Sequence, residues 1–320
     1  MKTICYGELM VDMIAENVLA EADCFRRYAG GAAANVAVQL RRLGGESSFL
    51  GKLGADAFGD YLLEDLRGCR VDTDAVIRDP VRRTTVAFVG RNEKGIPEYL
   101  FYRMGGASDT IVPEEIDQAY LRQAGMLYSS SLMLTTPAVR RTTRWLFGFA
   151  KENGIPIAFD LNLRPTAWES VEEARATVEK IFEQIDILKI NDEEMRFLLQ
   201  RDVDLAAAGE ALLERYPALR VLLLTCGGKG TYLFGRDVGT IYVEPHRVKA
   251  VDTTGAGDSY MGAFLYACES CGGNMERLEE MGRYAAAAAE LTIGARGAIQ
   301  AMPEKERLDA YCRQHGIPVF

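Results

Sequence analysis

The residues at positions 251–258 could bind an anion and remove a proton. The stretch reads Val-Asp-Thr-Thr-Gly-Ala-Gly-Asp, and an apolar helical pattern follows at once. Gly255, Ala256 and Gly257 carry almost no side chain, so their backbone N–H groups can approach a ligand closely. If they form the first turn of a helix, those N–H groups have no partner within it, and with the helix dipole they suit a phosphate.

Asp258 stands at the edge of this expected anion site. A carboxylate repels a bound phosphate, so its presence there needs a chemical reason. A general base that takes a proton from a hydroxyl attacking phosphorus would provide one. The alternative interpretation is a glycine-containing loop in which Asp252 or Asp258 only caps a helix.

Polar clusters follow three other predicted strands. They are Asn162 with Arg164, Asn191 with Glu194, and Thr225 with Gly227 and Gly230. Taken singly, the first could be a solvated loop and the second a helix N-cap with its capping box. In sheets of parallel strands, ligands bind at the carboxyl ends of the strands. We therefore expect the clusters to share one site with residues 251–258.

Strands alternate with helices through most of the chain, which predicts an α/β fold with a mostly parallel sheet covered on both faces. The predicted strands are 3–7, 47–53, 126–132, 156–161, 185–190 and 221–225, followed by an antiparallel pair at 231–234 and 240–243. The predicted helices are 35–43, 54–67, 136–152, 169–184, 192–200, 204–215, 257–272, 275–293 and 304–314.

A predicted hairpin interrupts this alternation. Its β-rich runs at 84–89 and 98–103 are joined by turn chemistry at 91–95. We expect it to pair with the segments around 11–14 and 24–28 as a small lid, inserted from about 10–29 and 82–104 into a single domain of residues 1–320. A lid would exclude water from a phosphoryl donor.

Composition excludes several classes of protein. The 320 residues carry a net charge of −9 and a pI of about 5.0, which argues against a nucleic-acid-binding surface. With only two His residues, His-based catalysis and zinc sites are not expected. The seven Cys residues are scattered, and Cys268 and Cys271 lie in an apolar helical pattern, so free thiols in a reducing compartment are expected. No signal peptide and no apolar run of membrane length is visible, which indicates a cytoplasmic protein without a membrane partner.

These motifs together resemble the ribokinase and phosphofructokinase-B family of sugar kinases over essentially the whole chain. The most specific element is the run 252–258. The glycine turn at 30–35 with Gly51-x-x-Gly54-x-Asp56, the Asn191-x-x-Glu194 pair and the Thr225-x-Gly227-x-x-Gly230 turn resemble further family signatures. The resemblance implies a three-layer αβα sandwich, a small β-sheet lid, and ATP and Mg²⁺ as cofactors.

The resemblance also implies a role for each cluster. Asp258 would deprotonate a sugar hydroxyl, and Gly255, Ala256 and Gly257 would stabilise the transferring phosphoryl group. The residues that would contact the sugar are Asp12, Gly30, Gly31, Asn35, Tyr102, Arg103, Asn162 and Arg164. Those that would contact ATP are Lys189, Asn191, Thr225, Gly227 and Gly230. Asn191 and Glu194 would hold Mg²⁺ through waters, and Asp252 and Thr254, with backbone from 294–297, would hold a monovalent cation such as K⁺.

The identity of the sugar is less constrained. The runs 101–103, 128–132, 160–165 and 189–191 resemble the fructokinase branch, so fructose is the first expectation. The 2-keto-3-deoxygluconate kinases share the Tyr-Arg and Asn-x-Arg elements, and two arginines would suit an acid substrate. A nucleoside-like sugar is a third possibility, and a sugar-binding regulator without turnover is a distant one. A nicotinamide-dependent oxidoreductase is disfavoured because no G-x-G-x-x-G follows the first strand.

The quaternary structure is predicted from the lid alone. Lid strands with exposed edges often pair between subunits, so we expect a homodimer through the lid.

Overall fold

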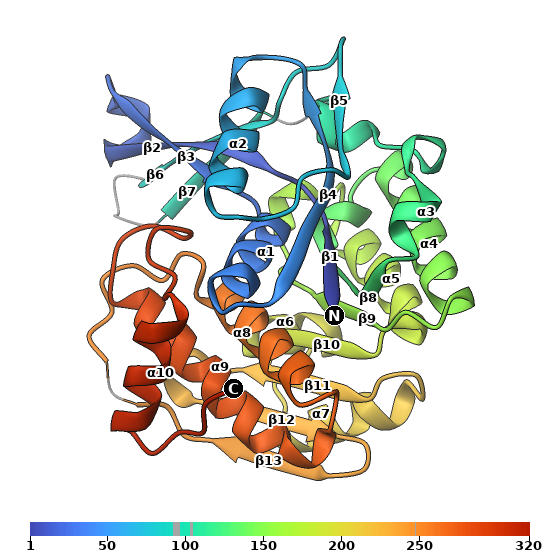
Figure 1. Ribbon diagram of the computed structural model, residues 1–320, viewed down its shortest axis with the longest axis vertical. Helices are drawn as coiled ribbons and strands as arrows, with labels where there is room; N and C mark the ends of the chain where they lie inside the picture. Colours follow the sequence, from blue (N-terminus) through green and yellow to red (C-terminus); the bar gives the residue numbers. More distant parts are fainter. Residues whose placement is uncertain (92–96, 103–104, 247) are drawn as a thin grey trace.

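The structure is a computed structural model that describes residues 1–91, 97–102, 105–246 and 248–320. Within these residues a sheet of nine strands forms the centre of the molecule, in the order β13-β12-β11-β10-β9-β8-β1-β4-β5 (Figure 1). Its strands are β1 (Lys2–Tyr6), β4 (Glu46–Gly54), β5 (Val76–Asp79), β8 (Ala124–Ser130), β9 (Ile157–Asp160), β10 (Ile187–Asn191), β11 (Val221–Thr225), β12 (Thr231–Gly235) and β13 (Gly239–Val243). Neighbouring strands from β5 to β11 are parallel, whereas β12 is antiparallel to both of its neighbours.

Helices cover both faces of this sheet, so the predicted three-layer arrangement is confirmed. One face packs on α1 (Ala32–Arg42), α2 (Ala57–Gly68), α8 (Ala256–Ser270), α9 (Leu278–Ile293) and α10 (Lys305–Gln314) in one buried cluster. The other packs on α3 (Gln118–Leu121), α4 (Pro137–Glu152), α5 (Val171–Ile181), α6 (Asp192–Leu199) and α7 (Leu205–Arg215) in a second. Because both faces of the central sheet are buried, strands such as β11 consist of nearly continuous apolar residues.

A smaller sheet stands beyond the carboxyl edge of the central one (Figure 1). Its strands are β2 (Met10–Val18), β3 (Phe25–Gly30), β6 (Val86–Arg91) and β7 (Pro97–Tyr102), in the order β3-β2-β6-β7. The hairpin of β6 and β7 pairs with β2 through β6, and β2 pairs with β3 on its other side. We call this small sheet the lid.

Two local expectations differ from the structure. The helix predicted from residue 35 begins at Ala32, because the alanines after the glycine turn already adopt helical conformation. The short strand β5 was not predicted, since four residues that include Arg78 and Asp79 carry too little alternation to signal a strand.

Among the described residues, no helix combines the length and the apolar character needed to cross a membrane. All seven cysteines are free thiols, including Cys268 and Cys271.

Candidate active site

A cleft of about 990 Å³ opens where β9, β10 and β11 end. Most of the residues expected to be functional line it: Asp12, Gly31, Asn35, Asn162, Arg164, Lys189, Asn191, Glu194, Thr225, Gly227, Gly230, Thr254, Gly255, Ala256, Gly257 and Asp258. Gly30, Tyr102 and Asp252 lie outside its lining. Arg103 lies outside the described residues.

The first turn of α8 forms the floor of the cleft. Gly255 has φ of 76°, in the left-handed region that favours glycine, and a Cβ there would stand 2.8 Å from the side chain of Ala298. The helix then begins at Ala256, so the N–H groups of Gly257 and Asp258 have no carbonyl partner one turn earlier in the helix. Such a turn suits an anion.

Asp258 is buried in this turn, with 8 % of its surface exposed. Asn35 Nδ2 donates to its Oδ2 at 2.7 Å, and Asn162 Nδ2 donates to its Oδ1 at 3.4 Å. Burial raises the pKa of Asp258 to about 6, although the bond from Asn35 and the charge of Lys189 act to lower it. A carboxyl group with a pKa near neutrality is matched to general-base chemistry.

Asn35 reaches Asp258 because α1 packs side by side with α8, although the two residues are 223 positions apart in sequence (Figure 1). One turn further along α1, Gln39 accepts a hydrogen bond from Ser259 at 3.0 Å. Asn35 also lines the cleft, so its side chain makes an interior hydrogen bond and borders the ligand site at once.

A buried ion pair lies beneath the same turn. Asp160 on β9 is opposite Lys189 on β10 in the strand register, and Lys189 Nζ contacts Asp160 Oδ2 at 2.7 Å. Only 1 % of Asp160 and 5 % of Lys189 is exposed. Burial alone would lower the pKa of Lys189, but the negative charges of Asp160 and Glu194 raise it above its usual value.

Asn191 and Glu194 form the capping box that begins α6, so the helix-cap interpretation is confirmed. Asn191 Oδ1 accepts from the N–H of Glu194 at 2.8 Å, and Glu194 Oε2 accepts from the N–H of Asn191 at 2.9 Å. Glu194 Oε1 accepts from the N–H of Leu163 at 2.7 Å. Burial, and then the charge of Asp160, raises the pKa of Glu194.

The same pair fits a water-mediated Mg²⁺ site. Each carboxylate oxygen of Glu194 has a second lone pair beyond its one backbone bond, and both residues face the cleft. Mg²⁺ keeps several waters and commonly uses one or two carboxylates plus substrate phosphates. Across the described part of the chain, no group of three or more His, Cys, Asp or Glu side chains is placed to hold a metal ion.

Asp252 ties the α8 turn to the loop that follows α9. Its Oδ1 accepts from the N–H and the hydroxyl of Thr254, at 3.0 and 2.7 Å, and its Oδ2 accepts from the N–H of Gly297 at 3.0 Å. These bonds outweigh burial and lower the pKa of Asp252, which keeps it anionic. The carboxylate and the 294–297 loop thus meet where a monovalent cation was expected.

The lid brings a second acidic group to the opposite end of the cleft. Asp12 on β2 faces the cleft, and Gly30 on the neighbouring strand leaves room for its carboxylate. Burial, and then the charge of Glu8, raises the pKa of Asp12 to about 7. Glu8 lines the cleft next to the start of α1, where its Oε1 accepts from the N–H of Ala32 at 3.3 Å.

Tyr102 does not join this group. In the lid register it is opposite Val86, which is opposite Val11, so these side chains lie on the lid face away from Asp12. The ring of Tyr102 packs edge-on against Phe88, with centroids 5.5 Å apart, and 65 % of the residue is exposed. The structure therefore gives no support to Tyr102 as a residue that contacts the sugar.

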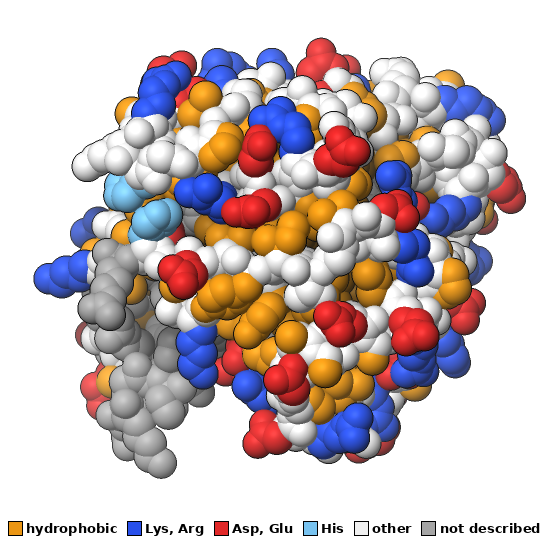
Figure 2. All heavy atoms as spheres, turned by 90° about the horizontal axis from the view of Figure 1, so that it is seen from below, with side chains coloured by type: hydrophobic (Ala, Val, Ile, Leu, Met, Phe, Trp, Pro, Cys, Tyr) orange, Lys and Arg blue, Asp and Glu red, His pale blue; other side chains and the backbone are white. Residues whose placement is uncertain are grey.

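The other end of the cleft lies between the turn after β11 and α9. The connection from β13 to α8 passes this end and is held by Glu290 on α9. Oε1 of Glu290 accepts a hydrogen bond from the N–H of His246 at 2.7 Å. Tyr311 donates to Glu290 Oε2 at 3.0 Å, and the rings of His246 and His315 are 4.9 Å apart. The two histidine side chains lie together on this face of the molecule (Figure 2).

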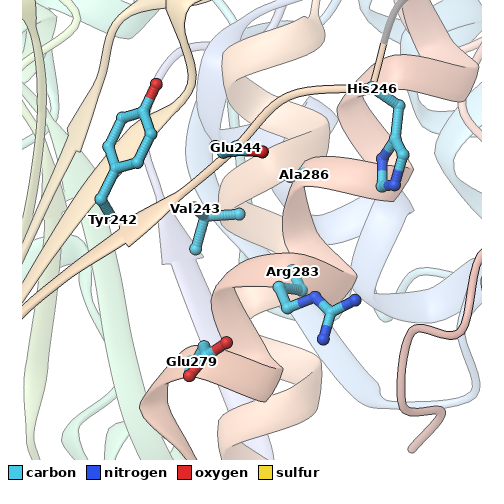
Figure 3. A pocket seen from close by; sticks show the side chains of 7 residues that line it. All are labelled: Tyr242, Val243, Glu244, His246, Glu279, Arg283 and Ala286. Carbon is cyan, nitrogen blue, oxygen red and sulfur yellow. The ribbon is translucent and has the colours of Figure 1, made fainter.

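A side pocket of about 290 Å³ continues from this end, between β13 and α9 (Figure 3). It shares Val243, His246 and Ala286 with the cleft. Tyr242 stands across from Arg283 in this pocket, and its hydroxyl donates to the carbonyl of Lys229 at 2.6 Å.

Glu8, Glu290 and His246 are among the lining residues that the sequence analysis missed. Glu8 could have been found, since it follows β1 just as the recognised clusters follow their strands. Glu290 and His246 carry no such signal, because Glu290 lies inside a helix and His246 lies in a connection without a recognisable motif.

The chain is similar to known proteins over nearly its whole length. Residues 2–305 match the model of a family described as pfkB family carbohydrate kinase. A probable fructokinase-2 of Arabidopsis thaliana is 36% identical over 307 residues, which cover 94% of this chain and 92% of that protein. A crystal structure of fructokinase with bound ATP from Xylella fastidiosa superposes with a TM-score of 0.89 at 29% identity, covering 98% and 99% of the two chains. A double mutant of the Vibrio cholerae O395 fructokinase, bound to fructose, ADP and a potassium ion, superposes with a TM-score of 0.86 at 26% identity and 97% coverage of both.

Proposed function

The chain belongs to the pfkB family of carbohydrate kinases, and we propose that it transfers the γ-phosphoryl group of ATP to a hydroxyl of fructose. The observation that carries this proposal is Asp258. It is a buried carboxylate with a pKa of about 6, at the first turn of α8, in a cleft that is lined at one end by Asp12 of the lid and at the other by Thr225 and Glu290.

The expected reaction uses the chain's own groups at each step. Asp258 accepts the proton of the sugar hydroxyl, the oxygen forms a bond to the γ-phosphorus, and the bond to the β-phosphate oxygen breaks, which releases ADP. The backbone N–H groups of Gly255 and Gly257 would face the charge that develops on the phosphoryl oxygens, whereas the N–H of Ala256 donates to the carbonyl of Thr253 at 3.3 Å. Thr225 also lines the cleft, and we expect it to contact the nucleotide.

We propose two cation sites beside these groups. Asn191 and Glu194 would hold Mg²⁺ through waters, and the ion would neutralise charge on the ATP phosphates. Asp252 and Thr254 would hold a monovalent cation such as K⁺ behind the α8 turn. The anionic state of Asp252 and its bonds to both loops support the second site.

The acidic sugar end favours a neutral substrate over an acid one. Glu8 and Asp12 both line this end, and the charge of Glu8 already raises the pKa of Asp12. The carboxylate of 2-keto-3-deoxygluconate would bring a further negative charge next to Glu8 and to Asp12, which a pKa of about 7 leaves partly ionised at neutral pH. Hydroxyl groups of fructose can instead donate hydrogen bonds to these carboxylates.

ADP release from ATP and Mg²⁺ tests the proposal directly. The panel is fructose, 2-keto-3-deoxygluconate, ribose and a set of nucleosides, and we expect the highest kcat/KM with fructose. A higher kcat/KM for the keto-acid would overturn the substrate assignment and leave the kinase assignment intact. Sugar binding without turnover on any member of the panel would support a regulatory protein instead.

We also propose that two copies associate through the lid. Its outer face carries Leu100 and Tyr102, which are 50% and 65% exposed, next to the packed rings of Phe25 and Phe88. The strands β3 and β7 form the free edges of the lid. Sedimentation velocity should show a dimer that Leu100→Lys converts to a monomer; a wild-type monomer at tens of micromolar would contradict the proposal.

A cytoplasmic location is the last part of the proposal. The seven free thiols suit a reducing compartment. Fractionation of cells that express the chain should find it with cytoplasmic markers, and recovery with a membrane or organelle fraction would contradict this part.

A further inference from the structure

Glu290 is a buried carboxylate in an alanine-rich stretch of α9. It follows five alanines, and 8 % of its surface is exposed. A buried carboxylate is costly unless hydrogen bonds compensate for the lost water. Tyr311 on α10 supplies one donor, and His246 supplies both its backbone N–H and its Nδ1, which lies 3.1 Å from Oε2. These donors come from outside α9, so the carboxylate joins three separate segments of the chain.

The connection between β13 and α8, which carries His246, contains no helix or strand among its described residues from 244 to 253. A backbone bond from Val251 to the carbonyl of Ile293, at 2.8 Å, holds the end of it that is nearer to α8. Among the described residues from 244 to 250, the hydrogen bonds are those of His246, and all of them end on Glu290. Because few contacts order a segment without regular structure, loss of this anchor would release it.

This connection forms a wall of the cleft at the end away from the lid. In the proposed reaction the sugar lies at the lid and the γ-phosphoryl group at Asp258, so the nucleoside of ATP must extend to the other end. Figure 3 shows His246 of the connection beside α9, and these two segments contribute the apolar lining there: Pro245, Val248, Ala250, Ala286, Ala289 and Ile293. Apolar walls of this kind suit a flat base.

We propose that Glu290 is a positioning residue for the nucleoside end of the cleft. It holds the connection at His246 against α9 and so sets the affinity for the nucleotide, whereas the rate of phosphoryl transfer is set at the α8 turn. Both carboxylate oxygens of Glu290 already accept bonds from His246 or Tyr311, so Glu290 acts through the connection and not on the base. This inference rests on the proposed kinase function.

A simpler role for Glu290 is to stabilise the packing of α9 on α10, and Asp309 provides the matched control. Asp309 on α10 is also 8 % exposed and accepts from the hydroxyl of Tyr284 on α9 at 3.2 Å, but neither residue lines the cleft. Glu290→Ala and Asp309→Ala thus each remove a buried carboxylate that joins the same two helices. We expect both variants to lower the melting temperature.

Steady-state kinetics, measured well below both melting temperatures, separate the two roles. Because a wall that is no longer preorganised binds its ligand more weakly, Glu290→Ala should raise the KM for ATP about tenfold and keep kcat within about threefold of wild type. Asp309→Ala should keep both constants within about twofold of wild type. An unchanged KM for ATP in Glu290→Ala, or an equal rise in Asp309→Ala, would assign Glu290 to packing alone and overturn the proposal.

Glu290→Gln tests the anchor separately from the charge. Glutamine keeps an oxygen that can accept from the N–H of His246, so the KM for ATP should stay within about threefold of wild type. A glutamine variant as impaired as the alanine variant would overturn the anchoring role.

Calorimetry with ADP makes the test independent of the sugar and of turnover. We expect ADP to bind Glu290→Ala about tenfold more weakly than it binds wild type or Asp309→Ala. Equal affinities of all three proteins would overturn this inference and leave the kinase proposal intact. A wild-type chain that does not bind ADP would overturn the kinase proposal, and this inference with it.

Discussion

The hydrogen bond from Asn35 to Asp258 should set the pH at which the enzyme becomes active. Asn35 Nδ2 donates to the carboxylate at 2.7 Å in a buried environment. Burial raises the pKa of Asp258 to about 6, and this bond acts in the opposite direction because it stabilises the charged form. Asn35→Ala removes the donor, so the pKa of Asp258 must rise further.

The magnitude follows from the strength of such a bond. A hydrogen bond to a charged group contributes about 1.5–3 kcal/mol, and one pKa unit corresponds to about 1.4 kcal/mol, so the expected shift is about one to two units. The general base works only when ionised, so activity rises with pH through its pKa. Wild-type Asp258 would be about 90% ionised at pH 7, whereas the variant would be about 10–50% ionised and would recover above about pH 9.

The assay is direct quantification of ADP across pH 5–9.5, which gives kcat/KM for the sugar at fixed ATP. Gln39→Ala is the matched control, because Gln39 lies one turn along α1 and bonds Ser259 instead of Asp258. We expect the midpoint to move in Asn35→Ala and to stay in Gln39→Ala, although both lose stability. An unchanged or lower midpoint in Asn35→Ala would refute the claim that this bond stabilises the carboxylate.

Three further outcomes are expected. Asp258→Asn should lower kcat by orders of magnitude and yet raise the melting temperature at pH 8. The raised pKa of Asp258 favours its neutral carboxyl form, so the stability that this group contributes below about pH 4 is lost as the pH rises through about 6, at a cost of about 3 kcal/mol. Equal wild-type melting curves at pH 4 and 8 would contradict this. Gly257→Ala should push the Lys189 ammonium aside and lower kcat about tenfold with little change in KM for fructose, and wild-type kinetics would contradict it. Glu194→Gln keeps a residue that can complete the capping box, so melting should change little while a titration shows a higher Mg²⁺ requirement; an unchanged requirement would argue against a metal role for Glu194.

The position of the run 252–258 at a helix start in the cleft could be predicted, because the signal is local. The run 252–258 places small residues, a helix start and a carboxylate within one stretch, and the strand-end rule brings the Asn191 and Thr225 clusters to it. The side of the lid on which Tyr102 lies could not be predicted. It depends on the register between β2, β6 and β7, and a shift of one residue would move its ring to the opposite face.

Contacts between residues that are far apart in the chain could not be predicted from the sequence either. Lys189 was expected near the nucleotide, but its position under Gly257 depends on the register with Asp160, which no local pattern specifies. The contact of Glu290 with His246 joins the middle of a helix to an irregular connection 44 residues away. Such contacts arise from packing between elements, so they become visible only in the folded chain.

The order of strands in the central sheet has a consequence for how the enzyme is made. From β8 to β13 each new strand joins the edge left by the one before it, in the order in which the ribosome releases the chain. The turn after β11 can therefore form before Asp258 has been synthesised. Asn35 is synthesised 223 residues before Asp258, its hydrogen-bond partner. The turn after β11 can thus form in a growing chain before Asp258 exists, whereas the pair of Asn35 and Asp258 can form only afterwards.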